Sequence, residues 1–89
     1  MDLSMANESN TYETRDLPIA SALKASGASV IRITRDEKGR GHWVFADFSK
    51  CQQIVMEYMA NELTLDAKTL MGAQRDLKTL LNESGGRND

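Results

Sequence analysis

The fold of this chain is set by the stretch from Ser29 to Asp47, which reads S-V-I-R-I-T-R-D-E-K-G-R-G-H-W-V-F-A-D. Apolar and polar residues alternate in both of its halves, as they do in strands that bury one face. The polar segment 36–41 between the halves contains two glycines, which is typical of a hairpin loop. The sequence therefore predicts two antiparallel strands, over residues 30–35 and 42–46.

The alternation assigns the hairpin side chains to two faces of the predicted ribbon. The face that packs on the core should carry Ile31, Ile33, Trp43 and Phe45. The opposite face is expected to carry Val30, Arg32, Thr34, His42 and Val44.

One helix is expected before the hairpin and another after it. Asp16 can cap the first helix, over about 17–26, and Gly27 supplies the left-handed residue that ends it. Ser49 followed by Gln52 has the spacing of a capping box, which places the second helix at about 50–61. Apolar residues recur there with the period of a helix.

A third helix should follow Asp66, a favourable N-cap residue. Its apolar stripe includes Leu70 and Leu77, while Lys68, Arg75 and Lys78 lie outside the stripe and are interpreted as a solvated face. With a short strand near residues 12–15, the predicted order is β-α-β-β-α-α. This is an α+β fold, in which three helices accompany a small antiparallel sheet.

The predicted core combines the inward residues of all these elements. It comprises Ile19, Leu23, Ile31, Ile33, Trp43, Phe45, Cys51, Ile54, Val55, Tyr58, Leu70, Leu77 and Leu80.

The 89 residues suffice for one domain. We expect that domain at 12–82, between disordered tails at 1–11 and 83–89, because the tail segments are polar and lack periodicity. No segment reaches the ~20 apolar residues of a membrane span, and the N-terminus lacks the features of a signal peptide. Cytoplasmic residence without membrane association is therefore expected.

The residue types that carry catalysis are scarce. The only histidine is His42 and the only cysteine is Cys51, and a strand and a buried helix stripe would keep them apart. No phosphate-binding, dinucleotide-binding or metalloprotease motif occurs. Carboxylates do not show the spacing of a calcium loop. The sequence thus favours a protein that is not an enzyme and that uses no cofactor or metal.

Charge is distributed unevenly along the chain. The net charge is −2, yet residues 28–46 hold four basic and two acidic side chains. A basic β-ribbon can follow a phosphate backbone, so weak nucleic-acid binding is the first functional hypothesis. The candidate surface comprises Arg32, Thr34, Arg35, Lys38, Arg40 and His42. Basic edge strands also serve simply to prevent aggregation, and that interpretation remains open.

The second hypothesis is a protein-interaction or homodimerisation module. If the helices cover one face of the sheet, Val30 and Val44 remain on the other face. A small sheet rarely leaves such residues bare, so a protein partner or a second subunit could cover them.

Three motifs carry a family resemblance. They are T-R-D-L at 14–17, H-W-V-F-A-D at 42–47 and A-Q-R-D-L-K-T-L-L at 73–81. The run from Tyr12 to Leu81 resembles a small family of prokaryotic and viral domains of unknown function. The resemblance implies the α+β order given above, and it implies no activity and no functional residue.

Overall fold

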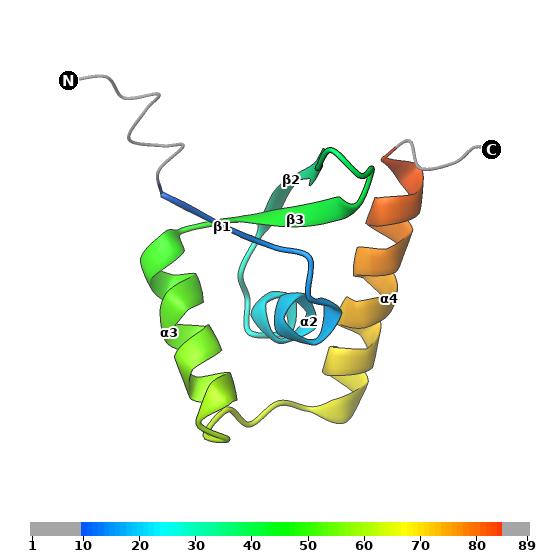
Figure 1. Ribbon diagram of the computed structural model, residues 1–89. Coiled ribbons are helices and arrows are strands. Elements are labelled where there is room, and N and C mark those ends of the chain that lie inside the picture. The colour runs from blue at the N-terminus through cyan, green and yellow to red at the C-terminus, as the bar shows by residue number, and fades with distance from the viewer. Residues whose placement is uncertain (1–9, 85–89) are drawn as a thin grey trace.

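The structure, a computed structural model, describes residues 10–84, and it has the predicted α+β order. Residues 1–9 and 85–89, where most of the disordered tails are expected, lie outside the described residues. In chain order the elements are β1 Thr11–Thr14, α2 Leu17–Ala25, β2 Val30–Arg35, β3 Gly41–Ala46, α3 Phe48–Met59 and α4 Ala67–Glu83. Figure 1 shows the helices together on one side of the sheet.

The sheet is antiparallel, with the strand order β1-β3-β2. The central strand β3 pairs on one edge with β1, where Tyr12 lies opposite Phe45. On the other edge it pairs with β2, where Ile33 lies opposite Trp43. The expected short N-terminal strand is thus present and completes the sheet.

A register shift between Val30 and Arg32 corrects the predicted faces of β2. An inserted residue reverses the alternation on its N-terminal side. Val30 therefore lies opposite Phe45 and packs against the core, whereas Ile31 is 47% exposed. Val44 was also expected to be uncovered, but it is only 1% exposed. It lies on the central strand between Glu13 of β1 and Arg32 of β2.

The helix boundaries follow the capping residues. The Asp16 carboxylate accepts a hydrogen bond from the Ile19 amide at 3.0 Å, and Gly27 has a φ of 102°, as predicted. α3 begins earlier than expected because Asp47, not Ser49, is its N-cap and accepts from the Lys50 amide at 3.2 Å. Asp47 has a positive φ of 70°, which Asp tolerates better than most residues.

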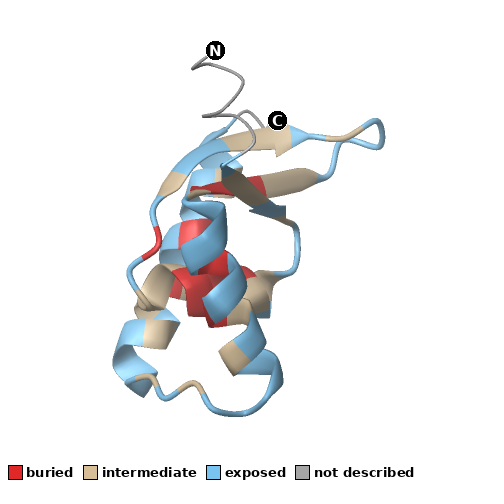
Figure 2. Cartoon of the chain, turned by 90° about the vertical axis from the view of Figure 1, so that its left-hand side faces the viewer, coloured by how far each residue is buried: buried red, intermediate tan, exposed pale blue. Residues whose placement is uncertain are grey.

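The hydrophobic core lies where α2 meets the sheet and the other two helices, as the buried segments in Figure 2 show. α2 lies between α3 and α4 (Figure 1). Leu23, Phe45 and Leu77 are fully buried at this centre. Tyr58 and Leu80, both expected in the core, are each 37% exposed because they stand at the margins of their helical stripes.

Candidate binding surface on the hairpin

The hairpin loop is organised by the carboxylate of Asp36. Its Oδ1 accepts hydrogen bonds from the backbone amides of Lys38 at 2.9 Å and Arg40 at 3.0 Å. Its Oδ2 accepts from the Nε of Arg40 at 2.9 Å. Asp36 therefore closes the loop and also pairs with one of the candidate cations.

His42 lies between two carboxylates from different strands. Its Nε2 is 3.1 Å from Oδ2 of Asp36, and its Nδ1 is 3.1 Å from Oε2 of Glu13. Only the doubly protonated imidazolium can donate from both nitrogens. Oε2 of Glu13 also accepts the hydroxyl of Thr34 at 3.0 Å. These contacts join β1 to both strands of the hairpin on the face away from the helices.

The hydrogen bond with His42 is the principal reason that the pKa of Asp36 lies well below its usual range. Bonds from the Arg40 backbone and side chain and from the Lys38 amide act in the same direction. Partial desolvation raises the pKa and offsets some of this effect. The Asp36 carboxyl is therefore ionised at neutral pH and balances part of the hairpin's positive charge.

Arg35 has a structural role at the end of α4. Its guanidinium donates to the carbonyl of Leu81 at 3.0 Å, to Oγ of Ser84 at 2.8 Å and to the carbonyl of Gly39 at 3.2 Å. The last carbonyls of a helix lack partners within the helix, and a cation there also interacts favourably with the helix dipole. Arg35 thus ties the hairpin to the C-terminus of α4.

The structure brings the six predicted surface residues together on the hairpin, but most of them already have partners. Arg40 and His42 contact carboxylates, Arg35 caps α4 and Thr34 donates to Glu13. Of the six, only Arg32 and Lys38 have side chains without a hydrogen bond or ion pair to another residue in the range 10–84. The free positive charge of the hairpin is consequently smaller than the sequence count suggests.

Glu13 is the residue that sequence reasoning missed. Its contact with His42 spans 29 residues of sequence, so no local charge count includes it. The signal was nevertheless available, because pairing β1 with β3 places Glu13 beside Val44 on the same face as His42.

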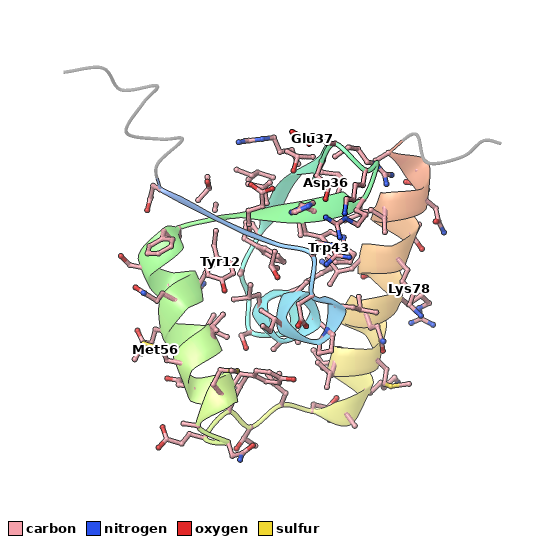
Figure 3. All side chains as sticks on the ribbon, in the orientation of Figure 1. Tyr12, Asp36, Glu37, Trp43, Met56 and Lys78 are labelled. Atoms are coloured by element: carbon pink, nitrogen blue, oxygen red, sulfur yellow. The ribbon has the colours of Figure 1, made fainter. Side chains whose placement is uncertain are left out.

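A second group of cations lies on α4. Lys68, Arg75 and Lys78 line a shallow hollow of about 560 Å³ on the outer face of this helix. None of the three side chains forms an ion pair with another residue in the range 10–84. In Figure 3, Lys78 points away from the body of the molecule. α4 therefore has three cationic side chains without a hydrogen bond or ion pair to residues 10–84, compared with two on the hairpin.

Cys51 is separate from His42 and is fully buried in the core. Its Sγ lies 3.4 Å from the carbonyl of Ala46, and burial is the main factor that raises the thiol pKa. A buried thiol with a raised pKa is a poor nucleophile. The two residue types that suggested a catalytic pair thus occupy unrelated environments.

A comparison with known protein families assigns the chain to one of them. A family model described as a domain of unknown function, DUF5659, matches residues 9–83. The chain belongs to the DUF5659 family. No curated protein and no solved structure shows significant similarity to it. The match covers every helix and strand described for this DUF5659 domain.

Two further observations concern the part of the chain that the structure covers. No helix within residues 10–84 is long and apolar enough to cross a membrane. Over the same residues, no cluster of three or more histidine, cysteine and acidic side chains is arranged to hold a metal ion.

Proposed function

We propose that this protein is a non-catalytic, cytoplasmic binding module whose partner is nucleic acid. The observation that carries the proposal is the row of unpaired cations on α4, formed by Lys68, Arg75 and Lys78. Arg32 and Lys38 are the hairpin residues that can add to it. Phosphate contacts made by such flexible cations provide affinity without sequence preference.

The arrangement favours a backbone contact over base recognition. The three cations follow one helix face, since positions 68, 75 and 78 recur at helical spacing. Trp43, which could have stacked on a base, is only 3% exposed and its indole bonds to α4. Binding should therefore be weak and strongly dependent on salt.

Fluorescence anisotropy with labelled single- and double-stranded DNA and RNA tests the proposal. We expect binding at low salt, and a plot of log K against log salt concentration with a slope of about −2 to −3 for three phosphate contacts. The triple variant Lys68→Gln/Arg75→Gln/Lys78→Gln should abolish it, and Arg32→Gln/Lys38→Gln should weaken it. The control Lys50→Gln removes an exposed positive charge from α3, a different helix.

Two results would overturn the proposal. One is the absence of salt-dependent binding to every nucleic acid tested. The other is competition by poly-glutamate at least as strong as that by unlabelled RNA, which would indicate an acidic protein as the partner.

A second candidate function is protein interaction or homodimerisation. Val30 and Val44 were first expected to mediate this interaction, but they do not form an exposed face. Other apolar side chains are exposed. Met56 and Met59 on α3 are 64% and 70% exposed, and Met56 points away from the body of the molecule in Figure 3. Methionine is frequent at adaptable binding surfaces.

Sedimentation velocity distinguishes the homodimer from a monomer. If α3 mediates self-association, the wild type should show a concentration-dependent dimer that Met56→Glu/Met59→Glu removes. Lys68→Glu, which introduces an acidic side chain on α4 instead of α3, is the control. A monomer at high protein concentration would contradict the homodimer.

A further inference from the structure

We propose that His42 is a pH-sensitive latch, which ties the edge strand β1 to the hairpin when its imidazole is protonated and releases Glu13 of β1 when the imidazole is neutral. Three parts of the fold meet at this side chain, because Glu13 belongs to β1, His42 to the central strand β3 and Asp36 to the hairpin loop. β1 is four residues long and pairs with β3 at the edge of the sheet (Figure 1). The cations of α4 take no part in these contacts, so the latch is independent of the proposed nucleic-acid binding.

The two contacts of His42 have different requirements in its two protonation states. Each ring nitrogen faces a carboxylate oxygen at 3.1 Å, and an imidazolium donates to both. A neutral imidazole has one N–H, so its other nitrogen presents a lone pair to a carboxylate, and two acceptors at that distance repel each other. One contact must therefore open when His42 loses its proton. Histidine is the side chain that ordinarily changes charge between about pH 5 and 8.

The contact with Glu13 is the one that opens. Asp36 is held in place, because its carboxylate also accepts hydrogen bonds from the Lys38 amide and from the amide and Nε of Arg40. The side chain of Glu13 is 50% exposed, and among residues 10–84 its one other partner is the hydroxyl of Thr34. It can turn into the solvent without disturbing the loop. Neutral His42 should therefore keep its proton on Nε2, where it donates to Asp36.

The other charged groups around His42 do not substitute for its two carboxylates. Alternation along the strands places Arg15, directly after β1, and Arg32 of β2 on the same face of the sheet. Within residues 10–84, neither forms a hydrogen bond with the carboxylates that contact His42. Arg40 is linked to His42 only through the shared Oδ2 of Asp36. Carboxylates ordinarily stay ionised above about pH 5, so His42 alone sets the response between about pH 5 and 8.

Opening of the latch loosens β1 without detaching it. Tyr12 still lies opposite Phe45 in the sheet, and its ring remains 6.0 Å from that of Phe48 on α3. A half-exposed ion pair contributes little to stability, so the change should be small and local. We expect the protection of the β1 amides against hydrogen exchange to fall about 2- to 5-fold as the latch opens.

NMR spectroscopy of the full-length, ¹³C,¹⁵N-labelled protein between about pH 5 and 8 tests this proposal. His42 is the only histidine, so its imidazole signals report its protonation and its tautomer without ambiguity. Amide exchange is measured by magnetisation transfer and expressed relative to an unstructured chain at the same pH. The amides of β1 should lose protection with the same midpoint as the imidazole titration, whereas those of β2 should keep theirs.

Glu13→Gln isolates the contact that opens. The side-chain amide of glutamine can accept from a protonated Nδ1 or donate to a bare one, so it suits both states of His42. In this variant the protection of β1 should become independent of pH while His42 still titrates. The matched control is Glu37→Gln, because Glu37 is a hairpin carboxylate that does not contact His42. It should retain the response of the wild type.

Several results would overturn the proposal. They are an imidazole that does not change protonation between about pH 5 and 8, protection of β1 that stays constant while His42 titrates, and an undiminished pH response in Glu13→Gln. A neutral imidazole with its proton on Nδ1 would place the opening at Asp36 and contradict the role of Glu13. Equal losses of protection in β1 and β2 would indicate a change in global stability in place of a latch on β1.

Discussion

The indole Nε1 of Trp43 donates a hydrogen bond to the backbone carbonyl of Leu77, 3.1 Å away. This bond joins the central strand β3 to α4, and it crosses 34 residues of sequence. Figure 3 shows Trp43 between the sheet and this helix. The only tryptophan of the chain is thereby a structural residue, and its polar atom is used inside the fold.

Trp43→Phe should retain most of the packing and remove this hydrogen bond. We expect the free energy of unfolding to fall by about 1–2 kcal/mol, because a smaller ring is left and the donor is lost. Urea denaturation followed by circular dichroism measures the change. A loss below about 0.5 kcal/mol would show that the bond does not contribute.

Phe45 and Ile31 should differ sharply when truncated. Phe45→Ala removes a fully buried ring and should cost about 3–5 kcal/mol. Ile31→Ala, at the register shift, removes a side chain that is 47% exposed and should cost less than about 1 kcal/mol. Denaturant titration of both variants checks the assignment. Equal costs would mean that Ile31 faces the core after all.

Arg35→Ala should loosen the C-terminal turn of α4, because it removes the donors to Leu81 and Ser84. We expect a loss of about 0.5–1.5 kcal/mol in unfolding free energy and faster amide hydrogen exchange near the helix end. Arg32→Ala is the control, since its side chain has no such partner. Unchanged exchange in the Arg35 variant would contradict the capping role.

The Asp36 network predicts a pH dependence of stability. Because the pKa of Asp36 is lower in the folded state than its ordinary value of 3.8, the unfolded chain takes up this proton first as the pH falls. The stabilisation is thus complete above about pH 4 to 5 and is lost as the pH falls through 3.8 towards the folded-state value. Asp36→Asn should be less stable than the wild type at pH 7, and the difference should shrink in acid.

Denaturant titrations between pH 7 and pH 2 measure this difference. Glu37→Gln is the matched control, because it removes a carboxylate from the same loop without breaking a hydrogen bond. A difference between wild type and Asp36→Asn that is constant with pH would contradict the proposed linkage.

The accuracy of the sequence predictions depended on how local each feature is. The caps formed by Asp16 and Asp66 were predicted correctly because each carboxylate bonds an amide three residues along the chain. The N-cap of α3 was predicted at Ser49 and is Asp47; the prediction was wrong because both residues are of types that cap helices well. Their ranking depends on the left-handed conformation of Asp47, which tertiary structure imposes where β3 meets α3.

The faces of β2 show a different limit. Strict alternation placed Ile31 in the core, and one inserted residue reversed that assignment for Val30 and Ile31 while leaving Ile33 correct. Both registers bury aliphatic residues of similar size. Only the packing of β2 against β3 and the helices selects between them, so the sequence pattern could not.

The hairpin of residues 29–47 shows the same contrast between features that depend on nearby residues and features that depend on tertiary packing. The sequence by itself determined the order of the elements, most helix caps and the burial of Trp43 and Phe45, because periodicity and capping act over a few residues. Tertiary structure alone decided which charges remain free. Glu13 and the end of α4 approach the hairpin from distant positions and engage His42 and Arg35, and Coulomb interactions depend on distance in space, not in sequence.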